Sequence, residues 1–152
     1  FEYKWISASE KLSLDGAYTY SHFRFDEFVE GGVDHSGNQL PGTPRHHVYT
    51  RFNLSPWRKW DFHVDYHLIS SVYLNDANTA TSDGYQLINA GMAYEIVSGK
   101  KWNGSISANL HNLFHVQYSP MFQINAPGNQ PRYYYPGKPR SLYLNMVFTH
   151  KI

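Results

Sequence analysis

Apolar and polar side chains alternate with a period of two along most of the chain. Successive side chains of a β-strand point to opposite faces, so this period predicts strands with one apolar and one polar face. In the clearest stretch, the two sets are Trp102, Gly104, Ile106, Ala108 and Leu110, and Asn103, Ser105, Ser107, Asn109 and His111. The same alternation predicts strands at about 11–27, 45–55, 59–74, 85–97, 102–118 and 139–151, and a partial strand at 1–7.

The connections between the predicted strands alternate in length. Short turns are expected at 8–10, 55–58 and 98–101, and long loops at 28–44, 75–84 and 119–138. An up-and-down antiparallel meander would place all short turns at one end and all long loops at the other. Strands of about ten alternating residues with this asymmetry are typical of transmembrane β-barrels. The predicted fold class is therefore all-β: an antiparallel up-and-down meander, six to seven strands of a larger transmembrane β-barrel.

The four tryptophans favour a membrane location. Trp5, Trp57, Trp60 and Trp102 each lie beside a predicted short turn, and none lies in a long loop. Indole prefers the headgroup level of a bilayer, where its ring meets the apolar edge and its N–H stays wet. We interpret the four as membrane-interface aromatics, one half of an aromatic girdle. The alternative is a soluble β-sandwich with tryptophan caps, which the consistently small or charged polar faces disfavour.

Composition narrows the classes of function. The chain has 152 residues, a net charge of +1 and no cysteine. A net charge of +1 does not provide the basic surface that binds nucleic acid. Without cysteine, the chain forms neither disulfides nor thiolate metal sites. The first residue is Phe1 and no signal peptide is visible, so we interpret the chain as a piece whose upstream part is missing.

Four stretches of the chain carry characteristic motifs: LDGAYTYSHFRFD (14–26), NQLPGTPRHHVYTRFNL (38–54), SANLHNLFHVQY (107–118) and RYYYPGKPRSLYLNMVF (132–148). They resemble the C-terminal part of the barrel of TonB-dependent outer-membrane receptors. Their order and spacing resemble those of the family over nearly the whole chain, and the last two in tandem are the most specific. Two positions depart from the family pattern: His115 stands where Asp is usual, and Ile152 stands where most members have Phe or Trp.

The resemblance implies a receptor in the outer membrane of a Gram-negative bacterium that imports a scarce nutrient, most often a ferric siderophore. Residues 1–152 would be the C-terminal portion of the barrel, without the plug and the earlier strands. The implied partners are the rest of the barrel and the plug, TonB through the missing N-terminal region, outer-membrane lipid, the barrel-assembly machinery and a small-molecule ligand such as a metal chelate. No cofactor and no enzymatic activity are implied.

Two alternatives to the receptor stay open from the sequence. The chain, alone or as an oligomer, would form a small independent outer-membrane β-barrel with a structural or adhesive role, or it would be a soluble carbohydrate-binding β-module. Large plugged barrels have about 22 strands, so six or seven strands cannot enclose such a lumen by themselves.

Nine histidines raise the question of a metal site. His63 and His67 share the polar face of one strand, but four residues of strand separate them by about 13 Å. His46 and His47 point to opposite faces. No chelating motif is present, and we assign these histidines, and the aspartates beside them, to a hydrated inner wall.

The long loop at 119–138 holds the candidates for ligand binding. Aromatic loops on a rigid scaffold suit a planar or apolar ligand such as a catecholate chelate, and an arginine there would oppose its negative charge. The candidates are Met121, Phe122, Arg132, Tyr133, Tyr134 and Tyr135. The alternative is that these side chains pack the loop and form the outer aromatic girdle.

The assignment of faces predicts a pair of unequal substitutions. Ile106→Arg places a charge on the lipid side near the middle of a strand and should cost about 2–4 kcal/mol of folding free energy in a bilayer. Ser107→Arg faces the water-filled side and should cost far less. A folding titration in lipid vesicles measures both, and equal costs would contradict the assignment.

Overall fold

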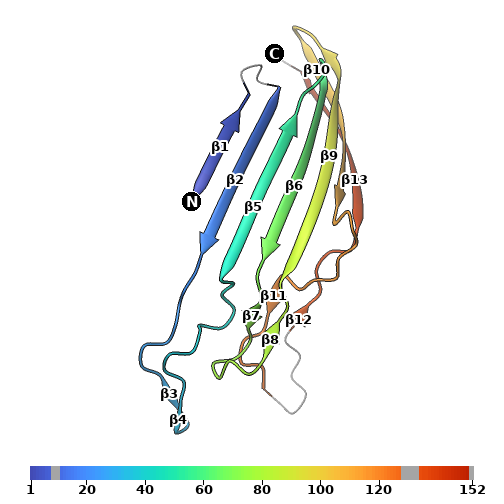
Figure 1. The fold of residues 1–152 in the computed structure, drawn as a ribbon. Helices are drawn as coiled ribbons and strands as arrows, with labels where there is room; N and C mark the ends of the chain where they lie inside the picture. The colour runs from blue at the N-terminus through green and yellow to red at the C-terminus, as the bar shows by residue number, and fades with distance from the viewer. Residues whose placement is uncertain (8–10, 128–133, 151–152) are drawn as a thin grey trace.

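A single antiparallel sheet of seven strands dominates the computed structural model, which describes residues 1–7, 11–127 and 134–150 (Figure 1). The strands are β1 (Glu2–Ile6), β2 (Leu12–Tyr20), β5 (His46–Leu54), β6 (Trp60–Ile69), β9 (Tyr85–Ser98), β10 (Trp102–His111) and β13 (Ser141–His150). They pair in that order, so the predicted up-and-down meander is confirmed. The short turn expected at 8–10, and Ile152, lie outside the described residues. No helix among the described residues is long and apolar enough to cross a membrane.

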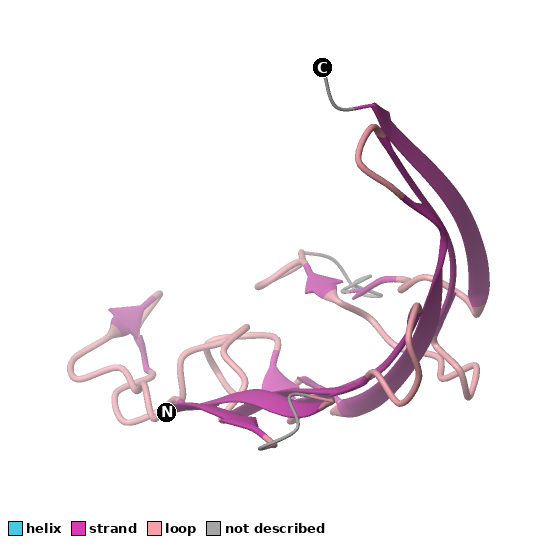
Figure 2. Ribbon diagram, turned by 90° about the horizontal axis from the view of Figure 1, so that it is seen from above, coloured by secondary structure: helices cyan, strands magenta, loops and turns pink. Residues whose placement is uncertain are grey.

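The sheet forms an open curved wall. Figure 2 shows the strands following a wide arc from β1 to β13, with loop segments on the concave side. Neighbouring strands twist relative to one another, and a long series of them curls the sheet in this way. The first and last strands do not pair with each other, so the described residues form part of a barrel rather than a closed one.

The register keeps the polar face and the apolar face separate across the whole wall. Arg51 of β5 lies opposite Asp15 of β2 and Asp65 of β6, while Phe52 lies opposite Leu14 and Val64. A slip of one residue would exchange the two faces, so the alternating pattern itself fixes the pairing. We call the face of Arg51 the inner face and the face of Phe52 the outer face.

Among the described residues, no second layer packs against the outer face. Val72 and Leu74 are the hydrophobic residues that the described part of the chain buries, and neither belongs to the seven-stranded sheet. On β13, by contrast, Leu144 is 70% exposed and Phe148 58% exposed. A water-soluble sandwich buries one face of each sheet against another layer. The sandwich alternative is therefore wrong for this fold.

The predicted strands extend too far into the long loops. β2 ends at Tyr20 rather than at 27, β6 at Ile69 rather than at 74, and β10 at His111 rather than at 118. After β10 the alternation continues in the sequence, but the backbone turns, because Asn112 and His115 adopt positive φ angles of 52° and 56°.

The long loops contain three short ribbons that the sequence pattern does not predict. They are β3 (Val29–Glu30) with β4 (Val33–Asp34), β7 (Val72–Tyr73) with β8 (Thr81–Ser82), and β11 (Met121–Phe122) with β12 (Tyr134–Tyr135). Strands of two residues carry too little alternation to be recognised from sequence.

A bulge shifts the alternation near the end of β9. Glu95 pairs with Ser105 and Val97 pairs with Gly104, so Ile96 is skipped in the ladder. Strict alternation along β9 would place both Tyr94 and Ile96 on the outer face. The structure instead pairs Val97 with Gly104, a residue of the outer face, so the alternation shifts by one residue after Glu95. A bulge of this kind also increases the local bend and twist of the strand, here close to the 98–101 turn.

Aromatic rings cover two of the strand glycines, Gly16 and Gly104. Phe148 of β13 lies over its cross-strand partner Gly104, where a Cβ would come within 2.7 Å of the ring. On the edge strand, the ring of Tyr3 occupies the corresponding space above its own partner, Gly16. A ring over glycine restores the packing that the missing side chain cannot supply.

Gly84 meets backbone rather than a side chain. A Cβ there would lie 2.5 Å from the carbonyl oxygen of Ile69 and 2.9 Å from backbone atoms of Ser70 and Ser71. The chain leaving β6 therefore passes directly against the start of β9, at the base of the second long loop.

Replacing this glycine should be costly, while a similar change in a short turn should not. Gly84→Ala forces two backbone segments apart, and we expect a loss of about 1–3 kcal/mol of unfolding free energy. Gly99→Ala is the matched control, because the nearest atom to its Cβ would be 3.6 Å away, and its cost should stay within about 0.5 kcal/mol. Denaturant unfolding in lipid vesicles measures both, and similar costs would contradict the close approach.

Candidate functional site

The two ends of the wall differ in construction. The short turns lie at one end and the long loops with their ribbons at the other (Figure 1). The tryptophans lie at the short-turn end: Trp5 in β1, Trp57 in the β5–β6 turn, Trp60 at the start of β6 and Trp102 at the start of β10. Trp5, Trp57 and Trp102 are at least half exposed. Their role at a membrane interface stays a prediction. The long-loop end is where side chains from distant segments converge.

Amide side chains join three of the long loops to one another. The Gln39 N–H donates to Asn78 Oδ1 at 2.7 Å, and Asn78 Nδ2 donates back to the Gln39 carbonyl at 2.9 Å. Asn38 Nδ2 donates to the Asp76 carbonyl at 2.8 Å. From the third loop, Asn125 accepts from the Asp76 N–H at 3.0 Å and donates to its carboxylate at 2.5 Å. We call these five residues the loop clamp.

The backbone of the clamp suits its residue types. Asn78 and Asn125 have φ angles of 54° and 52°, a left-handed region that asparagine tolerates better than most residues. Directly beside the clamp, Leu74 is 0% exposed and Val72 4% exposed. The loops therefore have a small core and a hydrogen-bond network of their own, which orders them in advance of any ligand.

Asn112 connects the two most specific sequence motifs. It is 3% exposed, and its Nδ2 donates to the carbonyls of Val116 at 2.8 Å and Lys138 at 3.1 Å. Its Oδ1 accepts from the Val116 N–H at 2.7 Å, and its own N–H donates to Asn89 Oδ1 at 2.9 Å. One buried amide thus ties the turn after β10 to the segment entering β13. We call this arrangement the Asn112 staple.

A tyrosine pair extends the same junction. The rings of Tyr85 and Tyr118 lie 4.8 Å apart between centroids. Tyr118 also packs against Gly137, and the Gly137 N–H donates to the Tyr118 carbonyl at 2.7 Å. The close contact with Tyr118 explains why glycine occupies position 137 in the PGKP stretch.

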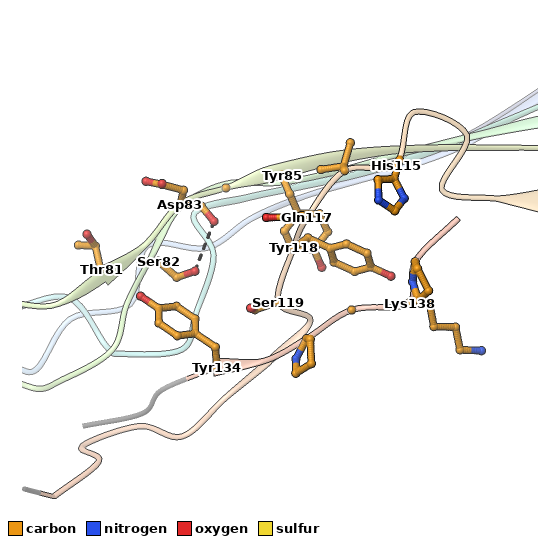
Figure 3. Close-up of a pocket in the computed structure, with 15 residues that line it drawn as sticks. Thr81, Ser82, Asp83, Tyr85, His115, Gln117, Tyr118, Ser119, Tyr134 and Lys138 are labelled. Carbon is orange, nitrogen blue, oxygen red and sulfur yellow. Dashed lines mark hydrogen bonds between the residues drawn. The ribbon is translucent and has the colours of Figure 1, made fainter. Parts of the chain in front are cut away.

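Two hollows lie on either side of this tyrosine pair. The first, which we call the loop hollow, has a volume of about 640 Å³, and Figure 3 shows Ser82 and Asp83 on one side of it and His115 and Lys138 on the other. The second, the wall hollow, has a volume of about 320 Å³ and lies against the inner face. Tyr85, Tyr118 and Lys138 line both, so the two hollows adjoin each other between the loops and the inner wall.

The charges at this end are mixed. Among the described residues that line the loop hollow, Lys138 is the cation and Asp83 the carboxylate, and the exposed His115 adds an imidazole ring. In the first long loop, hydrogen bonds from the side chain and backbone of Ser36 lower the pKa of Asp34 below its ordinary value. Asp34 therefore stays ionised at neutral pH and adds negative charge away from the hollow.

The inner face carries polar side chains below the wall hollow. Arg51 Nε donates to Asp65 Oδ1 at 2.5 Å and Arg51 Nη2 to Asp65 Oδ2 at 2.8 Å, a bidentate ion pair. His47, His67 and His111 line the wall hollow. Within the described residues, no group of three or more histidine, aspartate or glutamate side chains could hold a metal ion. The hydrated inner wall expected from the sequence stays a prediction.

The structure places only part of the candidate set at the hollows. Met121 and Phe122 form β11 and pair with Tyr135 and Tyr134 of β12, and the Phe122 and Tyr134 rings lie 6.3 Å apart. Of these four, Tyr134 lines the loop hollow. The remaining two candidates, Arg132 and Tyr133, lie outside the described residues.

The sequence analysis misses several residues that line the hollows. Tyr85 and Lys138 stand at the boundaries of predicted strands, and Tyr118 and His115 belong to the quoted NLFHVQY stretch. The sequence holds one signal that could have identified these residues: aromatic and basic residues are concentrated at the strand ends on the long-loop side. The contact between Tyr85 and Tyr118 has no such signal, because it depends on the turn at Asn112.

A family model for the TonB dependent receptor-like β-barrel matches residues 1–113. The chain belongs to this family. A search of curated proteins finds no significant match. The structure of this receptor barrel segment is similar to the siderophore receptor PiuA from Acinetobacter baumannii, with a TM-score of 0.73, 19% identity and coverage of 91% of this chain and 19% of that one.

Two further solved structures share the fold. The ferric citrate transporter FecA in its unliganded form has a TM-score of 0.75 and 21% identity, covering 91% of this chain and 21% of that one. BauA, the ferric preacinetobactin receptor from Acinetobacter baumannii, has a TM-score of 0.70 and 21% identity, covering 93% of this chain and 20% of that one. The receptor segment thus spans about a fifth of the length of these solved structures.

The Asn112 staple predicts a large cost for losing one amide. Asn112→Gly removes the side chain without adding strain at the positive φ, and we expect a loss of about 2–4 kcal/mol because part-buried backbone groups of Val116 and Lys138 lose their partner. Asn109→Gly is the control, since the Asn109 side chain forms no hydrogen bond within the described part of the chain. Its cost should be below about 1 kcal/mol.

Two measurements check the staple. The free energy of unfolding in lipid vesicles gives the cost of each variant, and limited proteolysis reports whether the loop that the staple closes has become more accessible. If Asn112→Gly and Asn109→Gly lose the same stability, with unchanged cleavage of the loop, the staple does not hold the junction.

Proposed function

We propose that this chain forms the C-terminal wall of an outer-membrane receptor of a Gram-negative bacterium that imports a scarce nutrient, with a ferric siderophore as the cargo. The observation that carries the proposal is the loop hollow, which lies among ordered loops at one end of a wall with a polar inner face and an apolar outer face. In this arrangement the outer face meets lipid, the inner face meets water and the plug, and the loops face outward from the cell.

The chemistry of the loop hollow supports a chelate as ligand. Tyr118 and Tyr134 offer aromatic surface for a planar group, and Lys138 offers one positive charge against an anionic chelate. We propose that Met121, Phe122, Arg132, Tyr133 and Tyr135 contribute from the rim of the same loop. The solved structures with the same fold include a siderophore receptor, a ferric citrate transporter and a ferric preacinetobactin receptor.

The proposed partners follow from the same arrangement. A plug would fill the lumen against the inner face, and TonB would act through the N-terminal region of the complete receptor. Further strands would pair with the outer edges of β1 and β13, since an unpaired edge is not tolerated in lipid. The barrel-assembly machinery would insert the complete barrel into the outer membrane. In this function the chain performs no chemical catalysis.

Growth on defined iron sources tests the cargo. A strain lacking the receptor gene should lose growth on one ferric chelate of a panel, presented as the only iron source, and regain it when the complete gene is restored. Growth of the deleted strain on every ferric chelate, together with loss of growth on another nutrient, would reassign the cargo. Recovery of the protein outside the outer-membrane fraction would reject the receptor function itself.

Lys138 gives a quantitative test of the ligand site. Lys138→Gln keeps the length and polarity of the side chain but removes its charge, and the affinity for an anionic ferric chelate should fall about tenfold, which corresponds to about 1.4 kcal/mol. Lys11→Gln, at the short-turn end, is the matched control and should leave the affinity unchanged. Quenching of intrinsic fluorescence measures both, and equal affinities in the two variants would exclude Lys138 from the site.

A further inference from the structure

A groove crosses the outer face near the short-turn end. It has a volume of about 230 Å³, and its walls include Trp60, Met92, Tyr94, Ile106, Ala108 and Leu144. The groove exists because the small side chain of Ala108 lies between two bulky cross-strand partners, Met92 on β9 and Leu144 on β13. Its lining is almost wholly apolar, as the open outer face requires.

An aromatic cluster forms one end of this groove. The Trp60 and Tyr94 rings lie 4.7 Å apart, and Trp60 stacks on Phe62 at 5.9 Å with an interplanar angle of 7°. Trp57 meets the edge of Phe62 at 6.4 Å. Two backbone hydrogen bonds hold the turn between Trp57 and Trp60. Within the turn, the Trp60 N–H donates to the Trp57 carbonyl at 3.2 Å, and from the neighbouring strand β9 the Glu95 N–H donates to the Lys59 carbonyl at 2.9 Å.

Two cations stand between these tryptophans. The turn reads W-R-K-W, so Arg58 and Lys59 lie between Trp57 and Trp60. Within residues 1–7, 11–127 and 134–150, neither Arg58 nor Lys59 forms an ion pair. The nearest acid in sequence, Asp61, already accepts a hydrogen bond from the Ser55 hydroxyl at 2.5 Å.

We propose that this groove and turn bind one anionic phospholipid, with an acyl chain along Ala108 and the phosphate at Arg58 and Lys59. The inference rests on the proposed function, which places the outer face in lipid. Charge complementarity selects the occupant: unpaired cations attract anionic lipid headgroups, and an apolar groove that ends at interfacial tryptophans matches a chain attached to such a headgroup. The acyl chain of a zwitterionic lipid also fits the groove, but its headgroup has no net negative charge to balance Arg58 and Lys59.

Native mass spectrometry of the complete receptor in detergent tests the site. The receptor is titrated with phosphatidylglycerol and with phosphatidylethanolamine of the same acyl chains. We expect phosphatidylglycerol to bind more tightly, and R58Q/K59Q to weaken its binding about 25-fold, the effect of two cations at about 1 kcal/mol each. Ala108→Phe, which fills the groove and keeps the cations, should weaken the binding of both lipids.

The control is K100Q/K101Q, which removes two exposed cations from the next short turn along the wall. It should leave the affinity for phosphatidylglycerol unchanged. Equal binding of the two lipids, an unchanged affinity in R58Q/K59Q, or an equal loss in the control would each overturn the proposed site. Heat-modifiable migration on gels confirms that every variant is folded.

The two proposals can fail separately. A receptor that is inserted in the outer membrane and still binds its ferric chelate, but shows no preference for phosphatidylglycerol, contradicts the lipid site alone. A chain that is absent from the outer membrane contradicts the receptor function, and the lipid site with it.

Discussion

The continuous ladder of backbone hydrogen bonds is the interaction on which the rest of this structure depends. A polar backbone group without a partner costs several kcal/mol in hydrocarbon, so a chain crossing lipid in extended form must pair every strand. The ladder runs unbroken from β1 to β13 apart from the skipped Ile96. It takes the place of a hydrophobic core between two layers, which the described residues of the wall do not form.

Because the ladder fixes the wall, the long-loop end and the short-turn end of the strands can differ in structure. The long-loop end gathers the buried hydrophobic residues Val72 and Leu74, the loop clamp and the staple, and so it resembles a small globular layer set on top of the wall. The short-turn end is made of brief turns rich in tryptophan and cations. Burial and side-chain hydrogen bonding among the loops are thus concentrated at one end, and the tryptophans at the other.

The sequence predicts what is local and periodic and misses what depends on a change of backbone direction. Each of the seven strands carries its own alternation, so their number and order follow directly from it. The positive φ angles of Asn112 and His115 leave no mark on that alternation, and the predicted strand therefore runs on into the loop. The contact of Tyr85 with Tyr118 joins distant segments through that turn, which is why the sequence does not predict these two residues in the lining of the hollow.

The staple at Asn112 separates the architecture of the wall from the identity of its last long loop. Because the buried Asn112 amide closes the base of that loop against Val116 and Lys138, the junction of β10 with β13 is fixed by contacts that do not involve β11 or β12. A change in β11 or β12 therefore leaves the contacts of the staple in place. The ribbon of this loop and the wall can therefore change independently of each other.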